Sequence, residues 1–225
     1  MRRLVFLLLL AVALMAPAAA GAVERTVSVN ATVERQVPND AAEVHFAVSK
    51  ERAGRAAALR VVALRVKAVI GASQGIAGVG AGDVSTGSIS VRRVKRGKKP
   101  VYRASEGVTV VTHQPEAAGE LVAAGVAAGA TSTRGPRFFV GDREAAYDAA
   151  LVEALEKAKA KAGLLAAAAG ARLGPAITIV EGGGVTPVFG PVSEEVGAGK
   201  DAPAPPVKPG KSTVEATVAA TFALE

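Results

Sequence analysis

Two segments near the ends of the chain alternate strictly between apolar and polar residues, and this pattern constrains the fold most. Apolar side chains occupy every second position from Val27 to Val33 and again from Val214 to Phe222. A period of two residues is typical of a strand with one buried and one solvated face. We therefore expect strands at both ends of the domain, with too few crossover helices between them for a doubly wound sheet.

Further strands and three helices are predicted between these two segments, and a turn is expected at Pro38-Asn39-Asp40. The expected strands cover residues 44–48, 84–94, 101–112, 131–140 and 176–180. The expected helices cover residues 52–72 and 143–169, with a short one that begins at Pro115. In the longest helix, Glu153 and Lys157 have the spacing of an ion pair.

The order of these elements predicts an α+β fold. We expect a mixed, largely antiparallel sheet or sheets covered by one short and two long helices, in the order ββα-ββ-α-β-α-ββ. Asp142 is expected to cap the longest helix, and Gly170 to end it. Residues 182–212 are rich in glycine and proline, which predicts a flexible loop before the last strand.

Small side chains must build the core, because the chain has no tryptophan, two tyrosines and six phenylalanines. It also has no cysteine, which excludes disulfides, thiolate metal sites and cysteine nucleophiles. Stability must therefore come from packing or from assembly.

The first 22 residues have the organisation of a cleavable secretory signal peptide. Arg2 and Arg3 precede an apolar run that ends before Pro17, and small residues follow. Cleavage fits after Ala20 or Ala22, and the second site leaves residues 23–225 as the mature domain. The apolar run is shorter than the roughly 20 residues that span a bilayer. We expect a periplasmic or secreted protein.

The positive charge of the chain gathers in one predicted hairpin. The formal net charge of +7 falls to +5 without Arg2 and Arg3, and the stretch from Arg92 to Arg103 contains seven basic residues and no acid. The candidate anion-binding residues are Arg92, Arg93, Lys95, Arg96, Lys98, Lys99 and Arg103.

Three roles fit this hairpin. It could bind anionic lipid head groups or envelope polymers, keep an exposed sheet edge from pairing, or meet an acidic surface of a neighbouring subunit. Nucleic acid is not expected as a partner, because the signal peptide predicts export and Tyr102 is the one aromatic residue available there for base stacking.

No catalytic, cofactor-binding or metal-binding residue is predicted. His45 and His113 are isolated, and neither a G-x-S-x-G nor an H-E-x-x-H sequence occurs. The glycine-rich stretch 78–82 follows a helix, the reverse of a dinucleotide-binding turn. Ser88 and Ser90 have the pattern of exposed strand positions, and Glu194-Glu195 falls in the loop. A hydrolase would require acidic residues from separate segments to converge in one cleft.

Several short sequences occur in a characteristic order along the mature chain. They are Val27-Ser28-Val29, Pro38-Asn39-Asp40, Gly75-Ile76, Val84-Ser85-Thr86, Tyr102, Val108-Thr109-Val110, Tyr147-Asp148-Ala149-Ala150, Lys161-Ala162, Leu173-Gly174 and Pro209-Gly210. In this order they resemble the SIMPL-domain family of bacterial exported proteins, which includes the periplasmic immunogenic proteins. The resemblance covers nearly all of residues 23–225, and the basic hairpin and the proline-rich stretch 202–209 depart from it.

The resemblance implies an envelope location, a mixed α/β fold, a link to envelope and oxidative stress, and, in at least one relative, a ring-like homo-oligomer. It supplies no catalytic residues. We therefore expect a non-enzymatic exported protein that assembles with itself and supports envelope integrity or stress tolerance. The alternative is a binding module for anionic envelope components that uses the basic hairpin.

Overall fold

The computed structural model describes residues 24–97, 99–182, 190–191 and 206–225. The predicted signal peptide lies outside these residues, as do Lys98 and most of the predicted loop 182–212. Within the described part of the chain, no helix combines the length and apolar character needed to cross a membrane.

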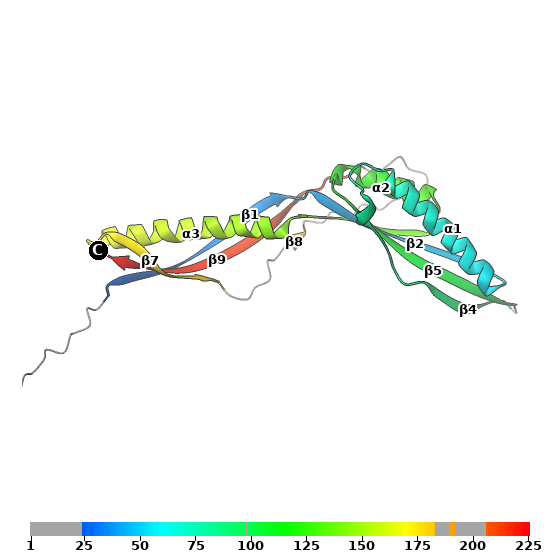
Figure 1. Cartoon of the computed structure of the whole chain (residues 1–225), viewed down its shortest axis with the longest axis horizontal. Helices are drawn as coiled ribbons and strands as arrows, with labels where there is room; N and C mark the ends of the chain where they lie inside the picture. The colour runs from blue at the N-terminus through cyan, green and yellow to red at the C-terminus, as the bar shows by residue number, and fades with distance from the viewer. Residues whose placement is uncertain (1–23, 98, 183–189, 192–205) are drawn as a thin grey trace, which may run out of the picture.

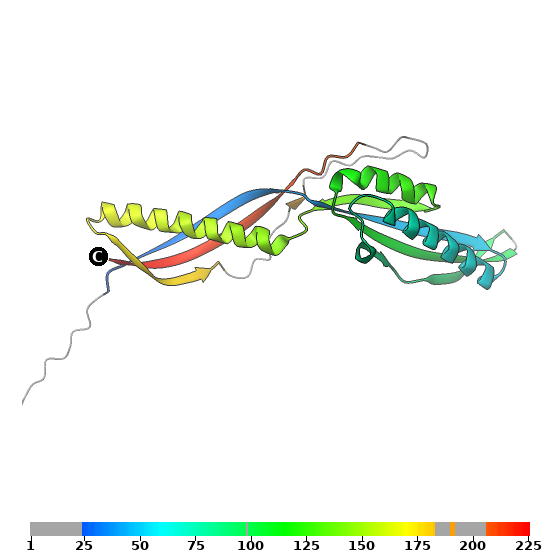
Figure 2. The same ribbon diagram turned by 45° about the horizontal axis from the view of Figure 1, so that its top comes forward.

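The molecule is elongated, with two lobes arranged end to end (Figure 1, Figure 2). The first, called the α3 lobe, has a sheet of order β1-β9-β7 with α3 along one face. Its elements are β1 (Thr26–Pro38), α3 (Arg143–Ala168), β7 (Leu173–Glu181), β8 (Gly190–Pro191, paired to β9) and β9 (Lys211–Leu224).

The second lobe, called the α1/α2 lobe, has a sheet of order β3-β5-β2-β6, with β4 also paired to β5. Two helices cover one face of this sheet (Figure 1). Its elements are β2 (Ala41–Arg52), α1 (Arg55–Gln74), β3 (Val84–Thr86), β4 (Ser90–Arg96), β5 (Lys99–Thr112), α2 (Ala118–Ala127) and β6 (Ser132–Phe139), with short 3-10 turns at Ala81–Asp83 and Pro115–Ala117.

The predicted α+β fold is confirmed, and every strand pair among the described residues is antiparallel. The single strand predicted over residues 84–94 is wrong, because β3 ends at Thr86 and β4 begins at Ser90. The three residues between them lie opposite only two residues of β5, which shifts the register by one. The loop predicted over residues 182–212 is also too long. β8 lies within it, and β9 begins at Lys211 rather than at Thr213.

A stripe of alanines carries the contact between α3 and its sheet. Five alanines spaced four residues apart are almost fully buried: Ala150, Ala154, Ala158, Ala162 and Ala166. The middle three of them pack in one cluster with Val29, Val218 and Phe222 of the sheet, and Ala150 packs with Val214 and Ala216. Asp142 caps the helix as predicted, because its side chain accepts the Ala145 N–H at 2.9 Å. Leu165, which lies on the same helix, is 49% exposed.

Larger side chains fill the core of the α1/α2 lobe. Phe46, Leu121 and Val62 are fully buried, together with valines of β2 and β5. Gly125 of α2 lies directly against the Phe46 ring, so that any Cβ at this position would overlap the ring. The glycine lets α2 approach the sheet closely enough to cover its one buried phenylalanine.

The predicted turn at Pro38-Asn39-Asp40 joins two strands that lie in different sheets. β1 pairs with β9, whereas β2 pairs with β5 and β6. The chain therefore crosses from one lobe to the other through Asn39-Asp40, and it returns through Gly141-Asp142 between β6 and α3.

Candidate functional site

Asn39 fixes the first crossing between the lobes. Its side chain is buried, and both polar ends have partners: Nδ2 donates to Pro209 O at 2.7 Å, and Oδ1 accepts from Ser212 Oγ at 2.6 Å. Its backbone N–H donates to Gly210 O at 3.2 Å. Buried polar groups that are fully paired hold a segment in one conformation, so the crossing is tied to the beginning of β9.

The second crossing is tied to the first by Asp40. Gly141 donates its backbone N–H to Asp40 Oδ1 at 2.6 Å. The next residue, Asp142, uses its carboxylate to cap α3. Both acidic residues at the junction therefore hold main-chain amides.

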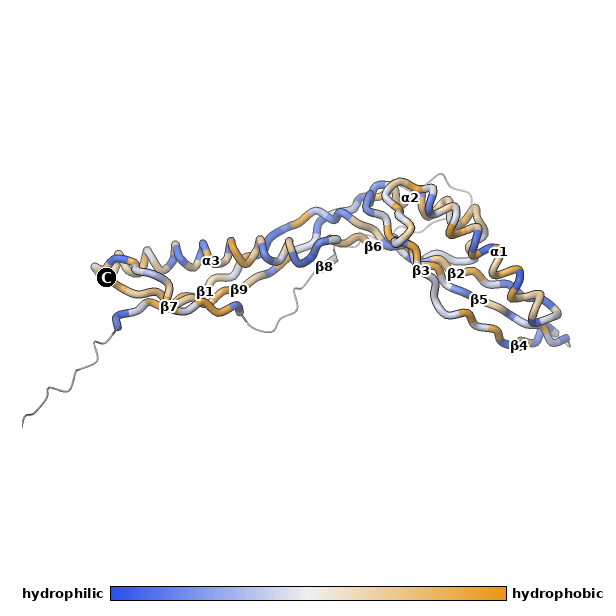
Figure 3. Tube along the Cα trace, in the orientation of Figure 1, coloured by the Kyte–Doolittle hydropathy of each residue, from blue (hydrophilic) through white to orange (hydrophobic). Residues whose placement is uncertain are grey.

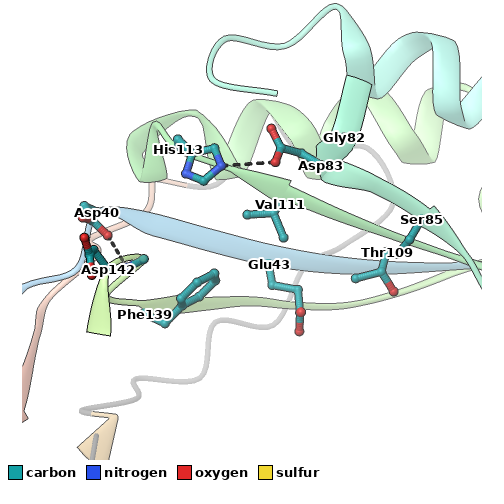
Figure 4. Close-up of a pocket in the computed structure, with 11 residues that line it drawn as sticks. Asp40, Glu43, Gly82, Asp83, Ser85, Thr109, Val111, His113, Phe139 and Asp142 are labelled. Atoms are coloured by element: carbon teal, nitrogen blue, oxygen red, sulfur yellow. Dashed lines mark hydrogen bonds and ion pairs between the residues drawn. The ribbon is translucent and has the colours of Figure 1, made fainter. Parts of the chain in front are cut away.

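A cavity of about 750 Å³ lies beside this junction (Figure 4). It opens on the face of the second sheet that the helices leave uncovered, because its strand residues Glu43, Thr109 and Val111 alternate with buried valines. Four acidic side chains and one histidine from separate segments line it: Asp40, Glu43, Asp83, Asp142 and His113.

Asp83 and His113 form the polar pair of this cavity. Asp83 Oδ2 accepts the Gly80 N–H at 2.8 Å, and His113 Nε2 lies 3.2 Å from Asp83 Oδ1 (Figure 4). The Gly80 hydrogen bond, and then the contact with His113, hold the pKa of the Asp83 carboxyl below its usual value. His113, which is isolated in the sequence, therefore has Asp83 as a partner in the fold.

The glycine-rich stretch 78–82 supports this pair structurally. Gly78 has φ +76°, and a Cβ there would lie 2.6 Å from the Gln114 backbone nitrogen. Its carbonyl accepts the His113 N–H at 2.9 Å. Close packing against the turn after β5 accounts for this glycine without a nucleotide.

The four carboxylates meet the geometric condition for a hydrolase, since separate segments bring them to one cleft. Each, however, already serves the fold: Asp40, Asp83 and Asp142 accept main-chain amides, and Glu43 pairs with Arg137 at 3.3 Å. A general acid needs a raised pKa, and that of Asp83 is lowered. No cluster among the described residues fits a metal ion. The arrangement favours structural roles, and the absence of enzymatic activity stays a prediction.

The two strands of the basic hairpin are longer than predicted, because they extend into residues 95–100, the segment between the predicted strands 84–94 and 101–112. β4 continues to Arg96, β5 starts at Lys99, and Gly97 has φ +59° in the turn. Arg92, Arg93, Lys95 and Lys99 are exposed, and Lys98 lies outside the described residues. Figure 3 shows hydrophilic residues at this far end of the lobe.

Two of the seven predicted anion-binding residues have an internal partner. Arg96 Nε and Arg103 Nε each donate to the Glu51 carboxylate at 2.8 Å. These hydrogen bonds, led by the one from Arg96, hold the pKa of Glu51 below its usual value. Arg96 and Arg103 are therefore already paired with Glu51 of the same chain.

Strand register brings further basic residues to the hairpin. Lys50 lies opposite Ala104 and Arg52 opposite Tyr102 in the β2–β5 ladder. Arg55, the first residue of α1, follows directly. Sequence reasoning missed these residues because the run 92–103 was considered alone. The signal that could have revealed them was the antiparallel pairing of the hairpin with the strand that contains His45.

The remaining residues examined from the sequence have local roles. His45 lies on the uncovered side of the sheet, with Nδ1 3.0 Å from Thr109 Oγ1. Ser90 shares a 2.8 Å hydrogen bond with Ser105, and Ser88 is exposed. Glu194-Glu195 lies outside the described residues.

Comparison with known proteins gave one family. A sequence model of the SIMPL family, described as a protein of unknown function (DUF541), matches residues 27–222. The match runs from β1 to β9 and so includes both lobes. No curated protein matches the chain.

Proposed function

This chain belongs to the SIMPL family, and on that premise we propose that it is an exported, non-enzymatic envelope protein that assembles with copies of itself. Its role would be to support envelope integrity or tolerance of oxidative stress. The observation that carries the assembly is apolar exposure in the α3 lobe. Within β7, Ile177, Ile179 and Val180 are 48%, 52% and 52% exposed. Apolar side chains gathered on one element typically mark an interaction site.

Light scattering of the purified protein over a range of concentrations tests the assembly. We expect a mass that is a multiple of the chain mass and that persists on dilution. A strict monomer at every concentration contradicts self-assembly.

Export is tested separately, by expressing the full chain in a bacterial host and sequencing the N-terminus of the recovered protein. Cleavage after Ala22 gives a chain that begins at Val23. Recovery of an uncleaved chain in the cytoplasm contradicts export.

The envelope role is tested by deleting the gene in its natural host. The deletion strain should lose viability in detergent and in peroxide, and the full chain supplied in trans should restore it. Unchanged survival in both challenges contradicts the proposed role.

The second candidate function is binding of anionic envelope components through the basic end of the α1/α2 lobe. The specific observation is that Arg92, Arg93, Lys95 and Lys99 are exposed and have no acidic partner among the described residues. Each cation near an anionic membrane contributes on the order of 1 kcal/mol. The strand register adds Lys50 and Arg52 to the same end.

Replacing Arg92, Arg93, Lys95 and Lys99 with glutamine tests this candidate. Vesicles with anionic lipids should bind the unsubstituted protein in a salt-sensitive way, and the fourfold variant should lose this binding. The matched control removes four exposed cations elsewhere: Arg60, Lys67, Lys159 and Lys208. Equal loss in both variants would show an effect of net charge alone, against a site at the hairpin.

A further inference from the structure

The two outer strands of the α3 lobe have very different free edges. Along β1, Lys157 Nζ donates to Thr32 O at 2.7 Å and Lys161 Nζ donates to Asn30 O at 3.1 Å. Arg35 of the same strand pairs with Glu153 at 3.6 Å. Main-chain acceptors of β1 that no strand uses are therefore covered by lysines of α3, and an incoming strand would have to displace them.

The free edge of β7 has no comparable cover in the described part of the chain. Ile179 lies opposite Ala220, which α3 buries, and Val180 lies opposite Ala219 on the other face. Both faces of this edge therefore present half-exposed branched side chains. Elsewhere the uncovered face of the sheet is polar, with hydrogen bonds of 2.8 Å between Ser28 and Thr221 and between Thr32 and Thr217.

The outer strands of the second sheet also carry features that discourage pairing. β4 has basic side chains along its length, and β6 contains Pro136 between Arg134 and Arg137. β3 is only three residues long. Lysines, arginines, prolines and short strands are the usual protection of free edges. Residues 177–181 of β7 contain no lysine, arginine or proline. The register shift between Ala176 and Thr178 lies at the start of this segment and the Glu181 carboxylate at its end, which leaves Thr178 to Val180 without such a feature.

An extended segment that joins the β7 edge would pair with main-chain amides and carbonyls that water otherwise satisfies. A second copy cannot offer β1, whose edge is covered. It can offer β7, and an edge that pairs with itself forms a closed two-fold dimer rather than an open filament. We infer that β7 of one chain pairs antiparallel with β7 of a second copy, which names the contact surface of the proposed self-assembly and rests on that proposal.

The register follows from the alternation of faces. Residues opposite each other in an antiparallel pair share a face. With the two-fold axis at Ile179, this residue meets Ile179 of the second copy, and Thr178 meets Val180. The isoleucines then cover each other on the α3 side, and Glu181, held by Tyr147 Oη at 2.7 Å, does not face its own symmetry mate.

Cysteine cross-linking tests this register, because the natural chain contains no cysteine to interfere. Opposed residues in an antiparallel pair have Cα atoms about 4.5–5.5 Å apart, within the range that a disulfide bridges. Ile179→Cys should give a disulfide-linked dimer under mild oxidation. The matched control Asn30→Cys, on the covered edge of β1, should not. Equal cross-linking of both variants, or none of Ile179→Cys, overturns the inference.

A charge on the free edge separates this inference from the proposed function. Ile179→Lys should halve the mass measured by light scattering, whereas Asn30→Lys should leave it unchanged. If the unsubstituted protein assembles and Ile179→Lys assembles equally well, assembly stands and the β7 contact is overturned. If the unsubstituted protein is a strict monomer, both proposals fail. Circular dichroism of the Ile179→Lys variant should show native secondary structure, so that loss of folding is distinguished from loss of pairing.

Discussion

The two lobes are built alike, from an antiparallel sheet with helices on one face, but their cores differ in side-chain size. In the α1/α2 lobe, Phe46 and Leu121 fill the space between sheet and helices. In the α3 lobe, the helix contributes a stripe of alanines. Apolar burial stabilises by roughly 25 cal/mol per Å², so each residue of α3 contributes less than its counterpart in the other lobe.

The difference shows two ways to cover a sheet. A short helix such as α2, with 10 residues, needs large partners and a glycine where it approaches closest. A long helix such as α3, with 26 residues, repeats a small contact many times and fixes its position with polar contacts to β1. We expect the α1/α2 lobe to depend on single residues and the α3 lobe to be sensitive to added volume.

The largest effect is expected from Phe46→Ala, which should lower the free energy of unfolding by about 3–5 kcal/mol. Phe46 is fully buried, and its removal leaves a cavity under α2. Chemical denaturation monitored by circular dichroism measures the change.

Gly125→Ala should also destabilise, because its methyl group overlaps the Phe46 ring. Combined with Phe46→Ala, its penalty should largely disappear, since the two residues share one space. Additive penalties would show that α2 does not depend on this contact.

Added volume should be the next largest effect. Ala158→Leu places three extra carbons in the buried contact between α3 and its sheet, and overpacking costs about 1–3 kcal/mol. The matched control is Ala160→Leu on the exposed side of the same helix, which should change stability by less than about 0.5 kcal/mol. A stabilising Ala158→Leu would mean that the α3 lobe has unfilled space, and the comparison of the lobes would then be wrong.

A smaller effect is expected at the junction. Asn39→Ala removes two side-chain hydrogen bonds and leaves the buried Ser212 hydroxyl without its partner, at a cost of about 1–2 kcal/mol. Thermal unfolding followed by separate probes in each lobe measures the change. The exposed Asn30→Ala serves as the reference. If the two lobes of the Asn39→Ala variant melt apart while those of the unsubstituted protein melt together, the junction couples them.

The smallest effect is the pH dependence of Asp83. Its pKa is lower in the folded protein, so its contribution is complete above the unfolded value near pH 4 and is lost as the pH falls through the folded value. At pH 6, Asp83→Asn should lower the free energy of unfolding by about 0.5 kcal/mol or less, because the pair is partly exposed. Thermal unfolding should show this as a slightly lower melting temperature. The difference should shrink as the pH falls below about 4. Ser85→Ala, in the same cavity, should not show this loss, and a constant difference across the pH range would contradict the assignment.

Sequence periodicity predicted the elements well where one face of a strand or helix meets the core. Val27 to Val33 and Val214 to Phe222 alternate because α3 covers only one face of their sheet. The Asp142 cap was predictable because it is a local contact within four residues. Composition predicted a core of small side chains, which describes α3 but not the surroundings of Phe46.

The remaining features depend on contacts between distant segments. The break between Thr86 and Ser90 arises where three residues of this segment lie opposite two residues of the neighbouring strand β5. The pairing of Glu51 with Arg96 and Arg103 depends on the β2–β5 register, which no local pattern encodes. The four carboxylates of the cavity come together because both crossings between the lobes lie beside one end of the second sheet.

The crossing at Asn39-Asp40 has a consequence for the order in which the chain folds. Residues 41–139 form the whole α1/α2 lobe and are inserted within the chain of the α3 lobe. Ser28 and Thr221, which are hydrogen-bonded, lie 193 positions apart. Contacts between such distant positions form slowly. The inserted lobe can therefore fold before β1 pairs with β9. The central strand β9 follows both of its neighbours, β1 and β7, in the chain, so a chain truncated before Lys211 would leave these two with no strand between them.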